Sequence, residues 1–265
     1  MTFIAAMDHS GGSTGGVLQR YGVDYTEDNK MELVHEMRLR MVHSSNFHGE
    51  NIDHAILYKD TVERGMVEEL RKKGIKAILK VDSGCNSQGL LKEFDLDAMI
   101  AFAQENKCVG TKMRSIIHNI DDIDIIIEQQ LQLAKRICDG GLVPIVEPEI
   151  PIDSPNKQIL EDQLLKSLTY QLHRFEGNQV WLKLTLPEIP NHYATLHEVP
   201  CVTRIVGLSG GYSTEQACLR LSLNRGMQAS FSRALSEGLY HDDSNEYFET
   251  AISKNISNIV EASRG

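Results

Sequence analysis

Eight apolar segments of strand length alternate with segments of helical periodicity along the chain. Strict alternation of this kind implies parallel strands joined by right-handed crossovers, and eight such units close into a (β/α)₈ barrel. A length of 265 residues is typical of one such barrel, and no linker or change of composition divides the chain. We therefore predict an α/β fold, a single (β/α)₈ TIM barrel that forms one domain over residues 1–265. The predicted strands are 2–7, 55–58, 75–82, 108–114, 142–149, 179–186, 202–208 and 227–231; the predicted helices are 30–42, 61–72, 95–106, 123–139, 157–175, 214–224 and 246–262.

The carboxyl ends of these strands carry chemically active side chains. An open, doubly wound sheet is the structural alternative, but it needs no polar residue at the end of nearly every strand. In a barrel all such residues converge on one face, where enzymes of this fold keep their active sites. The pattern therefore favours the barrel and predicts a site at that face. The residues concerned are Asp8, Lys80, Asp82, Lys112, Arg114, Glu147, Glu149, Lys183, Ser209, Gly210, Gly211, Ser232 and Arg233.

Lys183 is the most unusual of them, because it interrupts an apolar, β-prone run from Val180 to Leu186. A run of this kind is typical of a strand buried on both faces, where lysine is rarely found without a partner. A desolvated lysine near other cations is a common nucleophile, and its usual product is a Schiff base with a carbonyl substrate. The alternative is a lysine at the end of a strand whose ammonium group reaches water along its aliphatic stem.

Charged residues recur with a period of two in four of the strands, as in Lys-x-Asp, Lys-x-Arg, Glu-x-Glu and Lys-x-Thr. This period places both members of a pair on the same side of the strand. Inward-facing carboxylates and ammonium groups would form a mixed-charge network suited to proton transfer. The alternative is an ion-pair network that only fills the barrel, although barrels are mainly filled by branched apolar side chains.

Two glycine-rich segments are candidates for phosphate binding. Ser209-Gly210-Gly211 lies between the seventh strand and a helix, where backbone N–H groups can approach an anion, and Arg233 at the end of the eighth strand adds a charged contact. Residues 9–16, predicted to be a loop, could bind a second phosphate through Ser10 and Ser13. The alternative for this loop is a flexible turn. It is not a P-loop, because no Gly-Lys-Ser/Thr follows.

Composition excludes several other classes of function. The net charge of −10 argues against a nucleic-acid groove but allows a local anion site. There is no apolar run of membrane-spanning length and no secretory signal, so we expect a cytoplasmic protein without a membrane partner. Five scattered cysteines without a CxxC pair indicate reduced thiols rather than zinc ligands or disulfides. The oligomeric state stays open, and a homo-oligomer is compatible with the sequence.

Seven motifs, in their order along the chain, resemble those of class I fructose-bisphosphate aldolase in its shorter bacterial form. The resemblance covers nearly the whole chain, and the set is specific although each motif alone is weak. The motifs are Ala-Ala-Met-Asp-His-Ser-Gly-Gly-Ser-Thr (5–14), Leu-Lys-Val-Asp (79–82), Gly-Thr-Lys-Met-Arg (110–114), Val-Glu-Pro-Glu (146–149), Leu-Lys-Leu-Thr (182–185), Leu-Ser-Gly-Gly (208–211) and Ser-Phe-Ser-Arg-Ala-Leu (230–235).

The resemblance implies reversible cleavage of fructose 1,6-bisphosphate through a Schiff base, with no metal and no cofactor. It implies that Lys183 attacks the ketone, that Glu147 is the principal acid and base, and that Asp8 assists cleavage of the C3–C4 bond. Lys112 and Glu149 would hold the charge network that keeps Lys183 unprotonated.

The resemblance also implies residues that bind the substrate. Arg114 and Lys80 would line the channel, with Lys80 near the second phosphate. The phosphate of the dihydroxyacetone half would be held by Ser209, Gly210, Gly211, Ser232 and Arg233.

Two other functions remain open from the sequence. Another Schiff-base barrel lyase, acting on a different phosphorylated sugar, would share Lys183 but would not need two phosphate sites. A catalytically inactive barrel that binds sugar phosphates or a protein partner would have a broken charge network, whereas every expected charged position is occupied here.

Overall fold

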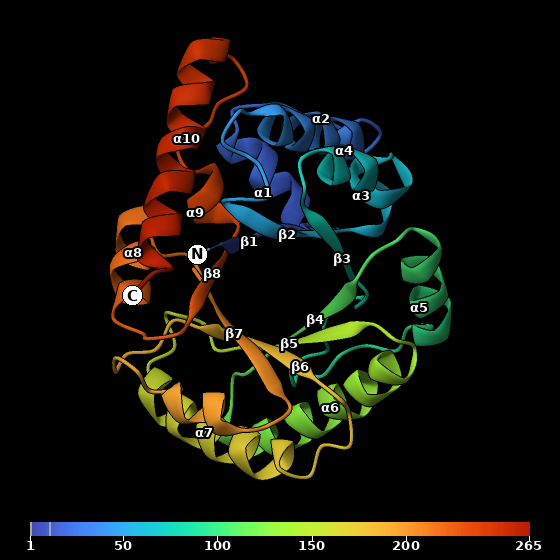
Figure 1. The fold of residues 1–265 in the computed structure, drawn as a ribbon, viewed down its shortest axis with the longest axis vertical. Helices are drawn as coiled ribbons and strands as arrows, with labels where there is room; N and C mark the ends of the chain where they lie inside the picture. The colour runs from blue at the N-terminus through green and yellow to red at the C-terminus, as the bar shows by residue number, and fades with distance from the viewer. Residues whose placement is uncertain (1, 11) are drawn as a thin grey trace.

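The computed structural model describes residues 2–10 and 12–265, with only the backbone of residues 12 and 13, and within these residues eight parallel strands close into a barrel. Each strand pairs with the next along the chain, and β8 pairs with β1 to complete the ring. Figure 1 shows the strands at the centre and the helices around them. The predicted (β/α)₈ barrel is thus confirmed. The strands are β1 Phe3–Met7, β2 Ile52–Leu57, β3 Lys76–Lys80, β4 Gly110–Ile116, β5 Val143–Glu149, β6 Val180–Thr185, β7 Val202–Leu208 and β8 Gln228–Phe231.

The helices form the outer layer of the barrel. Long helices such as α6 and α7 pack side by side, and in Figure 1 they cover the strands β5 to β7. Two short 3₁₀ helices, η1 Ile120–Asp122 and η2 Ala194–Glu198, complete the connections. The helices are α1 Gly12–Arg20, α2 Lys30–His43, α3 Lys59–Glu63, α4 Met66–Lys72, α5 Leu96–Glu105, α6 Ile123–Asp139, α7 Lys157–Leu172, α8 Thr214–Ser222, α9 Arg233–Ser236 and α10 Asn245–Ala262.

The strands are buried on both faces because the barrel interior covers one face and the helices cover the other. All five residues of β1 are buried, as expected for a parallel strand in this position. The pairing of β4 with β5 depends on Gly110, because a Cβ atom there would lie 2.5 Å from the carbonyl oxygen of Val143. A larger residue at this position would therefore push the two strands apart.

The helix α6 illustrates how the outer layer is fixed. Ile123, Ile127 and Leu131 recur at helical spacing and are buried against the barrel. The helix ends at a pair of glycines, and Gly141 has a φ of 74°, which favours glycine. The sequence predicts this helix with the bounds that the structure has.

Three connections differ from the predictions. Residues 12–16 were expected in a loop but form the start of α1. The expected single helix 61–72 is split into α3 and α4 at Gly65, whose φ is 86°. The link between β6 and β7, where no helix was predicted, contains η2.

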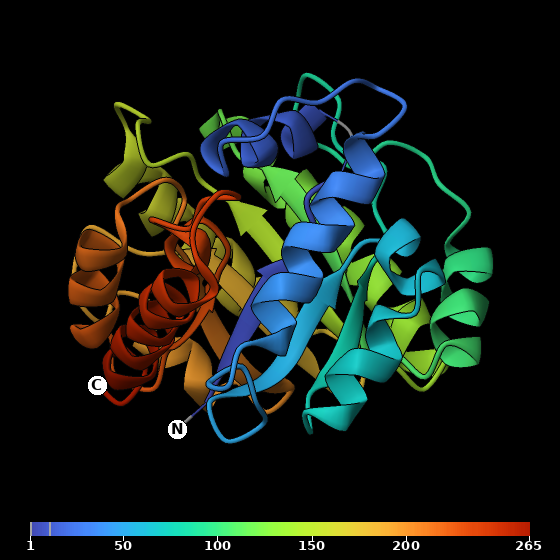
Figure 2. The same cartoon turned by 90° about the horizontal axis from the view of Figure 1, so that it is seen from above.

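The carboxyl ends of the strands form one rim of the barrel. In Figure 2 the N-terminus lies at the lower edge and α1, in dark blue, lies at the upper edge over this rim. Among the described residues, no helix is both long and apolar enough to cross a membrane. Because the carboxyl ends of all eight strands meet at this rim, the rim is the part of the fold that positions a site.

Candidate active site

A cavity of about 1090 Å³ opens at the carboxyl-terminal rim. Its walls come from the ends of the strands and from the loops that follow them, as the sequence predicts for a barrel of this kind. The predicted site residues that line it are Asp8, Ser10, Lys80, Asp82, Lys112, Arg114, Glu147, Glu149, Lys183, Ser209, Gly210, Ser232 and Arg233. Gly211 is not among the described residues that line it. The side chain of Ser13 lies outside the described part of the chain.

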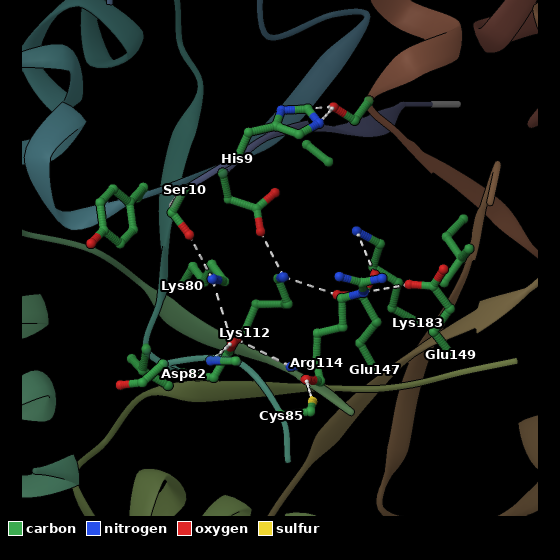
Figure 3. A pocket seen from close by; sticks show the side chains of 18 of the residues that line it. His9, Ser10, Lys80, Asp82, Cys85, Lys112, Arg114, Glu147, Glu149 and Lys183 are labelled. Carbon is green, nitrogen blue, oxygen red and sulfur yellow. Dashed lines mark hydrogen bonds and ion pairs between the residues drawn. The ribbon is translucent and has the colours of Figure 1, made fainter. Parts of the chain in front are cut away.

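A chain of four charged groups crosses the floor of this cavity. Lys183 Nζ on β6 lies 3.1 Å from Glu147 Oε1 on β5. The other carboxylate oxygen of Glu147 lies 3.0 Å from Lys112 Nζ on β4. Lys112 Nζ also lies 2.6 Å from Asp8 Oδ2, which follows β1. Figure 3 shows Lys112, Glu147 and Lys183 pointing toward one another from their separate strands.

Of these four charged residues, Lys112, Glu147 and Lys183 are each more than 95% buried, so their charges are poorly screened. Burial by itself would raise the pKa of Asp8, but the ammonium groups of Lys112 and Lys183 hold it well below its usual range. Burial acts on Glu147 in the same direction, and the same two lysines lower the pKa of that carboxyl. Burial would lower the pKa of Lys112, yet Asp8, Glu147 and Asp82 raise it. At neutral pH the site therefore contains two carboxylates around an ammonium group.

A second group of charges lies beside the first. Lys80 Nζ donates to Ser10 Oγ at 2.8 Å and lies 3.4 Å from Asp82 Oδ1. Asp82 is buried and also accepts from the backbone N–H groups of Gly84 and Arg114, at 3.0 and 3.2 Å. These contacts fix Asp82, so that Lys80 is held between Ser10 and Asp82, as Figure 3 shows.

Glu149, which the resemblance places with Lys112 in the charge network, pairs with Arg114. Its carboxylate forms an ion pair with Arg114 Nε, although the two side chains come from neighbouring strands that also carry Lys112 and Glu147. The carboxylate of Glu149 contributes most to raising the pKa of Arg114, against the effect of burial. Glu149 thus neutralises the wall of the cavity, and Glu147 is the carboxylate that contacts Lys183.

The glycine-rich loop after β7 has the geometry of an anion site. Gly210 and Gly211 have φ values of 59° and 123°, which favour glycine. The guanidinium of Arg233 lies directly over this loop, since a Cβ atom on Gly211 would be 3.0 Å from Arg233 Nη1. Backbone N–H groups and an arginine are therefore available together at the side of the cavity formed by β7 and β8.

His9 is a site residue that the sequence reasoning missed. It lines the cavity between Asp8 and Ser10, and its Nε2 lies 3.2 Å from Ser232 Oγ. Burial lowers the pKa of His9 to about 4, so the ring is neutral at pH 7. Its position directly after Asp8 at the end of a strand was the available signal. Tyr58 and Arg20, which also line the cavity, were missed as well.

Neutral contacts support the charged residues from behind. Thr185, two residues after Lys183, donates to the carbonyl of Ile150 at 2.8 Å and accepts from its N–H at 3.0 Å. The backbone N–H of Glu147 donates to the buried amide of Gln130 on α6 at 3.2 Å. The strands β5 and β6 are thereby held in register where Glu147 and Lys183 meet.

Comparison with known proteins gives concordant findings. The sequence model of the family described as "Glycolytic: Fructose-bisphosphate aldolase class-I" matches residues 2–186. Fructose-bisphosphate aldolase class 1 of Clostridium acetobutylicum is 42% identical over 279 residues, covering 98% of this chain and 95% of that protein. The protein of the same name from Synechocystis sp. is also 42% identical, covering 98% of this chain and 93% of its own length.

Solved structures with the same fold include aldolases. The fructose-bisphosphate aldolase of Plasmodium falciparum, solved with TRAP and a small-molecule inhibitor, has a TM-score of 0.76 at 20% identity, covering 99% of this chain and 90% of its own. An archaeal fructose 1,6-bisphosphate aldolase has a TM-score of 0.60 at 11% identity, covering 100% of this chain and 94% of its own. At these identities the likeness concerns the fold alone.

Proposed function

The chain belongs to the family of class I fructose-bisphosphate aldolases, and on that premise we propose that Lys183 is the amine that forms the Schiff base. The reaction is the reversible cleavage of fructose 1,6-bisphosphate to dihydroxyacetone phosphate and glyceraldehyde 3-phosphate. The observation that carries the assignment is the contact of 3.1 Å between Lys183 Nζ and Glu147 at the floor of the cavity. It supplies a buried amine with a proton acceptor and donor within hydrogen-bond reach.

Glu147 acts as the principal acid and base. Glu147 accepts a proton from the ammonium form of Lys183, and the resulting neutral amine adds to C2 of the ketose and forms a carbinolamine. Glu147 then gives this proton to the C2 hydroxyl, which departs as water and leaves a positively charged iminium on Lys183. Because Glu147 is buried between two lysines, its proton transfers occur where water competes poorly.

Asp8 assists the cleavage of the carbon–carbon bond. A proton leaves the C4 hydroxyl, the C3–C4 electron pair moves into the iminium to give an enamine, and C4 departs as the aldehyde of glyceraldehyde 3-phosphate. The carboxylate of Asp8 is held ionised by Lys112 at 2.6 Å, which suits it to attract that proton. Protonation of the enamine at C3 and addition of water to the iminium then release dihydroxyacetone phosphate.

Lys112 and the pair of Arg114 with Glu149 set the charge around these steps. Lys112 bridges Asp8 and Glu147, so a proton gained by one carboxylate changes the charge felt by the other. Arg114 and Glu149 line the channel that the sugar occupies.

Two phosphate sites lie on different sides of the cavity. Ser209, Gly210, Gly211, Ser232 and Arg233 hold the phosphate of the dihydroxyacetone half, next to Lys183. Lys80, with Ser10 and Ser13, holds the phosphate of the glyceraldehyde half. Support comes from the positive φ values of the two glycines and from the 2.8 Å contact that holds Lys80 against Ser10. The catalytic domain spans residues 1–265 and works in the cytoplasm, as a glycolytic enzyme family favours.

Borohydride trapping tests the role of Lys183. The protein is incubated with dihydroxyacetone phosphate, reduced and digested, and the added mass is located by peptide mass spectrometry. We expect a label on Lys183, unchanged by a metal chelator and lost in Lys183→Ala. Lys135→Ala, which removes a lysine paired with Asp139 on α6, is the control and should keep the label. Absence of label while dihydroxyacetone phosphate still binds would exclude Lys183 as the Schiff-base lysine.

A further inference from the structure

The helix α2 carries a buried arginine in its apolar stripe. Val34, Met37, Met41 and Val42 follow helical spacing and are buried against the barrel, and Arg38 falls in the same stripe with only 2% of its surface exposed. An arginine in such a position is costly unless hydrogen bonds and opposite charges compensate for its desolvation. Its contacts therefore indicate what it does.

Arg38 joins the segment that follows β1 to the helix α3 that follows β2. Its Nη2 donates to the backbone carbonyl of His9 at 2.9 Å, just beyond the end of β1. Its Nη1 donates to the hydroxyl of Thr61, a fully buried residue of α3. Arg38 is not among the described residues that line the cavity, so it lies behind the segment that carries Asp8.

The charge of Arg38 also interacts with the segment that carries Asp8. Burial lowers the pKa of Arg38 to about 10, while Asp8 and Asp60 act in the opposite direction. The guanidinium is therefore charged at neutral pH, and Asp8 is the larger of the two carboxylate influences on it. Asp8 thus has Lys112 in front of it, inside the cavity, and the charge of Arg38 behind it.

We infer that Arg38 is a positioning residue for the carbon–carbon cleavage step. By holding the carbonyl of His9, it fixes the backbone from Asp8 to Ser10, so that the carboxylate of Asp8 stays directed at Lys112 and the substrate. Displacement of a catalytic group by about 1 Å can lower a rate by a factor of about 100. This inference rests on the proposed function of Asp8, and it adds a residue of α2 to the residues on which the cleavage step depends.

The partial reactions separate positioning from a general effect on folding. Formation of the Schiff base uses Lys183 and Glu147, whereas cleavage of fructose 1,6-bisphosphate also uses Asp8. In Arg38→Gln we expect trapping of dihydroxyacetone phosphate on Lys183 to stay within about twofold of the parent, and kcat for cleavage to fall by a factor of about 30 to 100. A residue that only supported folding would lower both in proportion to the folded fraction.

A double-mutant cycle with Asp8→Asn tests the coupling. We expect Asp8→Asn alone to lower cleavage by a factor of about 100 or more, and Arg38→Gln added to it to cause less than about a threefold further loss, because coupled positions are not additive. If Asp8→Asn leaves cleavage intact, the proposed role of Asp8 is wrong. If Asp8→Asn is inactive but the effect of Arg38→Gln is additive with it, the inference about Arg38 is wrong.

Arg40→Gln is the matched control on the same helix. Arg40 donates to the carbonyl of His241 at 2.8 Å and lies over the ring of Phe248, so its loss removes a charge and tertiary contacts away from the cavity. The ratio of cleavage to trapping should not change in this variant.

Arg38→Lys keeps a charge and one donor, and it decides the question if Arg38→Gln does not fold. We expect about a fivefold fall in cleavage with trapping unchanged, since one of the two anchoring contacts survives. An equal fall of cleavage and trapping in Arg38→Lys would overturn the inference.

Discussion

The ammonium group of Lys112 lies between two carboxylates that come from different parts of the barrel. Asp8 lies at 2.6 Å and Glu147 at 3.0 Å, and the lysine itself is 2% exposed. Because Lys112 and Glu147 are buried and Asp8 is largely covered, removal of the lysine leaves two negative charges that repel each other in a poorly screened site. The protonation of Asp8 and Glu147 should therefore depend on Lys112 more than on any surface charge.

The variant Lys112→Met should shift the pH dependence of cleavage. In the parent protein Lys112 helps to hold the pKa of Asp8 below its usual range, so the active carboxylate persists as the pH falls. Without the lysine, burial raises the carboxyl pKa values, and the acid limb of kcat/KM should move upward by about 1 to 3 pH units. Profiles between pH 5 and 8 measure this shift, with Lys135→Met on the surface as control. Acid limbs that coincide in the two proteins would contradict it.

Three strands meet in a polar cluster at the opposite end of the barrel. Arg204 of β7 forms contacts of 2.8 and 3.1 Å with the carboxylate of Asp53 on β2, although β7 and β2 are not neighbours in the sheet. The guanidinium lies 5.0 Å from the ring centre of Trp181 on β6, and His54 packs edge-on against the same ring at 4.9 Å. These elements are joined there without taking part in the site.

Asp53→Asn should lower the free energy of unfolding but leave catalytic activity unchanged. Burial would raise the pKa of Asp53, but contacts with His54 and Arg204 hold it below its usual range. The stabilisation by this carboxylate is thus complete above the unfolded pKa, near 4, and is lost as the pH falls through the folded value. We expect a loss of about 1 kcal/mol at pH 7, because the pair is partly exposed.

Urea unfolding followed by the fluorescence of Trp181, the single tryptophan, measures this difference. The gap in the free energy of unfolding between Asp53→Asn and the parent should narrow as the pH is lowered from 7 toward 3.5, while kcat at pH 7 stays unchanged. A gap that widens toward acid pH would show that the sign is wrong.

At the scale of the molecule, barrel closure places the two proposed phosphate sites across one cavity. The loop after β7 and the start of α9 supply Gly210, Gly211 and Arg233 on one side. The ends of β1 and β3 supply Ser10 and Lys80 on another. A ketose with a phosphate at each end can engage both sides at once, with its C2 near Lys183. The distance between the two sites thus selects a sugar whose two phosphates are the same distance apart.

Lys80→Met should therefore discriminate between substrates. It removes the ammonium group proposed for the glyceraldehyde half, so kcat/KM for fructose 1,6-bisphosphate should fall by a factor of about 10 to 100, which corresponds to a charged hydrogen bond. Fructose 1-phosphate lacks the second phosphate, and its kcat/KM should change by less than about threefold. Steady-state kinetics with both sugars give the comparison. An equal loss for the two sugars would place Lys80 outside the second phosphate site.

Much of this protein is readable from local sequence because its signals are local. The apolar runs that form β1 to β8 and the helical period of α6 are set by neighbouring residues, so the barrel follows from them. The charged residues at strand ends, such as Lys183 and Glu147, are predictable for the same reason, since closure brings every strand end to one rim. The break between α3 and α4 at Gly65, by contrast, was not predicted, because it depends on the left-handed backbone conformation that Gly65 adopts in the fold.

The tertiary structure determined which charged side chains form ion pairs with one another. Glu149 pairs with Arg114, and Lys112 lies between Asp8 and Glu147, because register and barrel closure determine which side chains meet. Sequence alone determined that this chain is a barrel with a charged rim. The packing of α2 against the barrel placed Arg38 against the carbonyl of His9, since a contact between distant segments depends on the geometry of the closed fold.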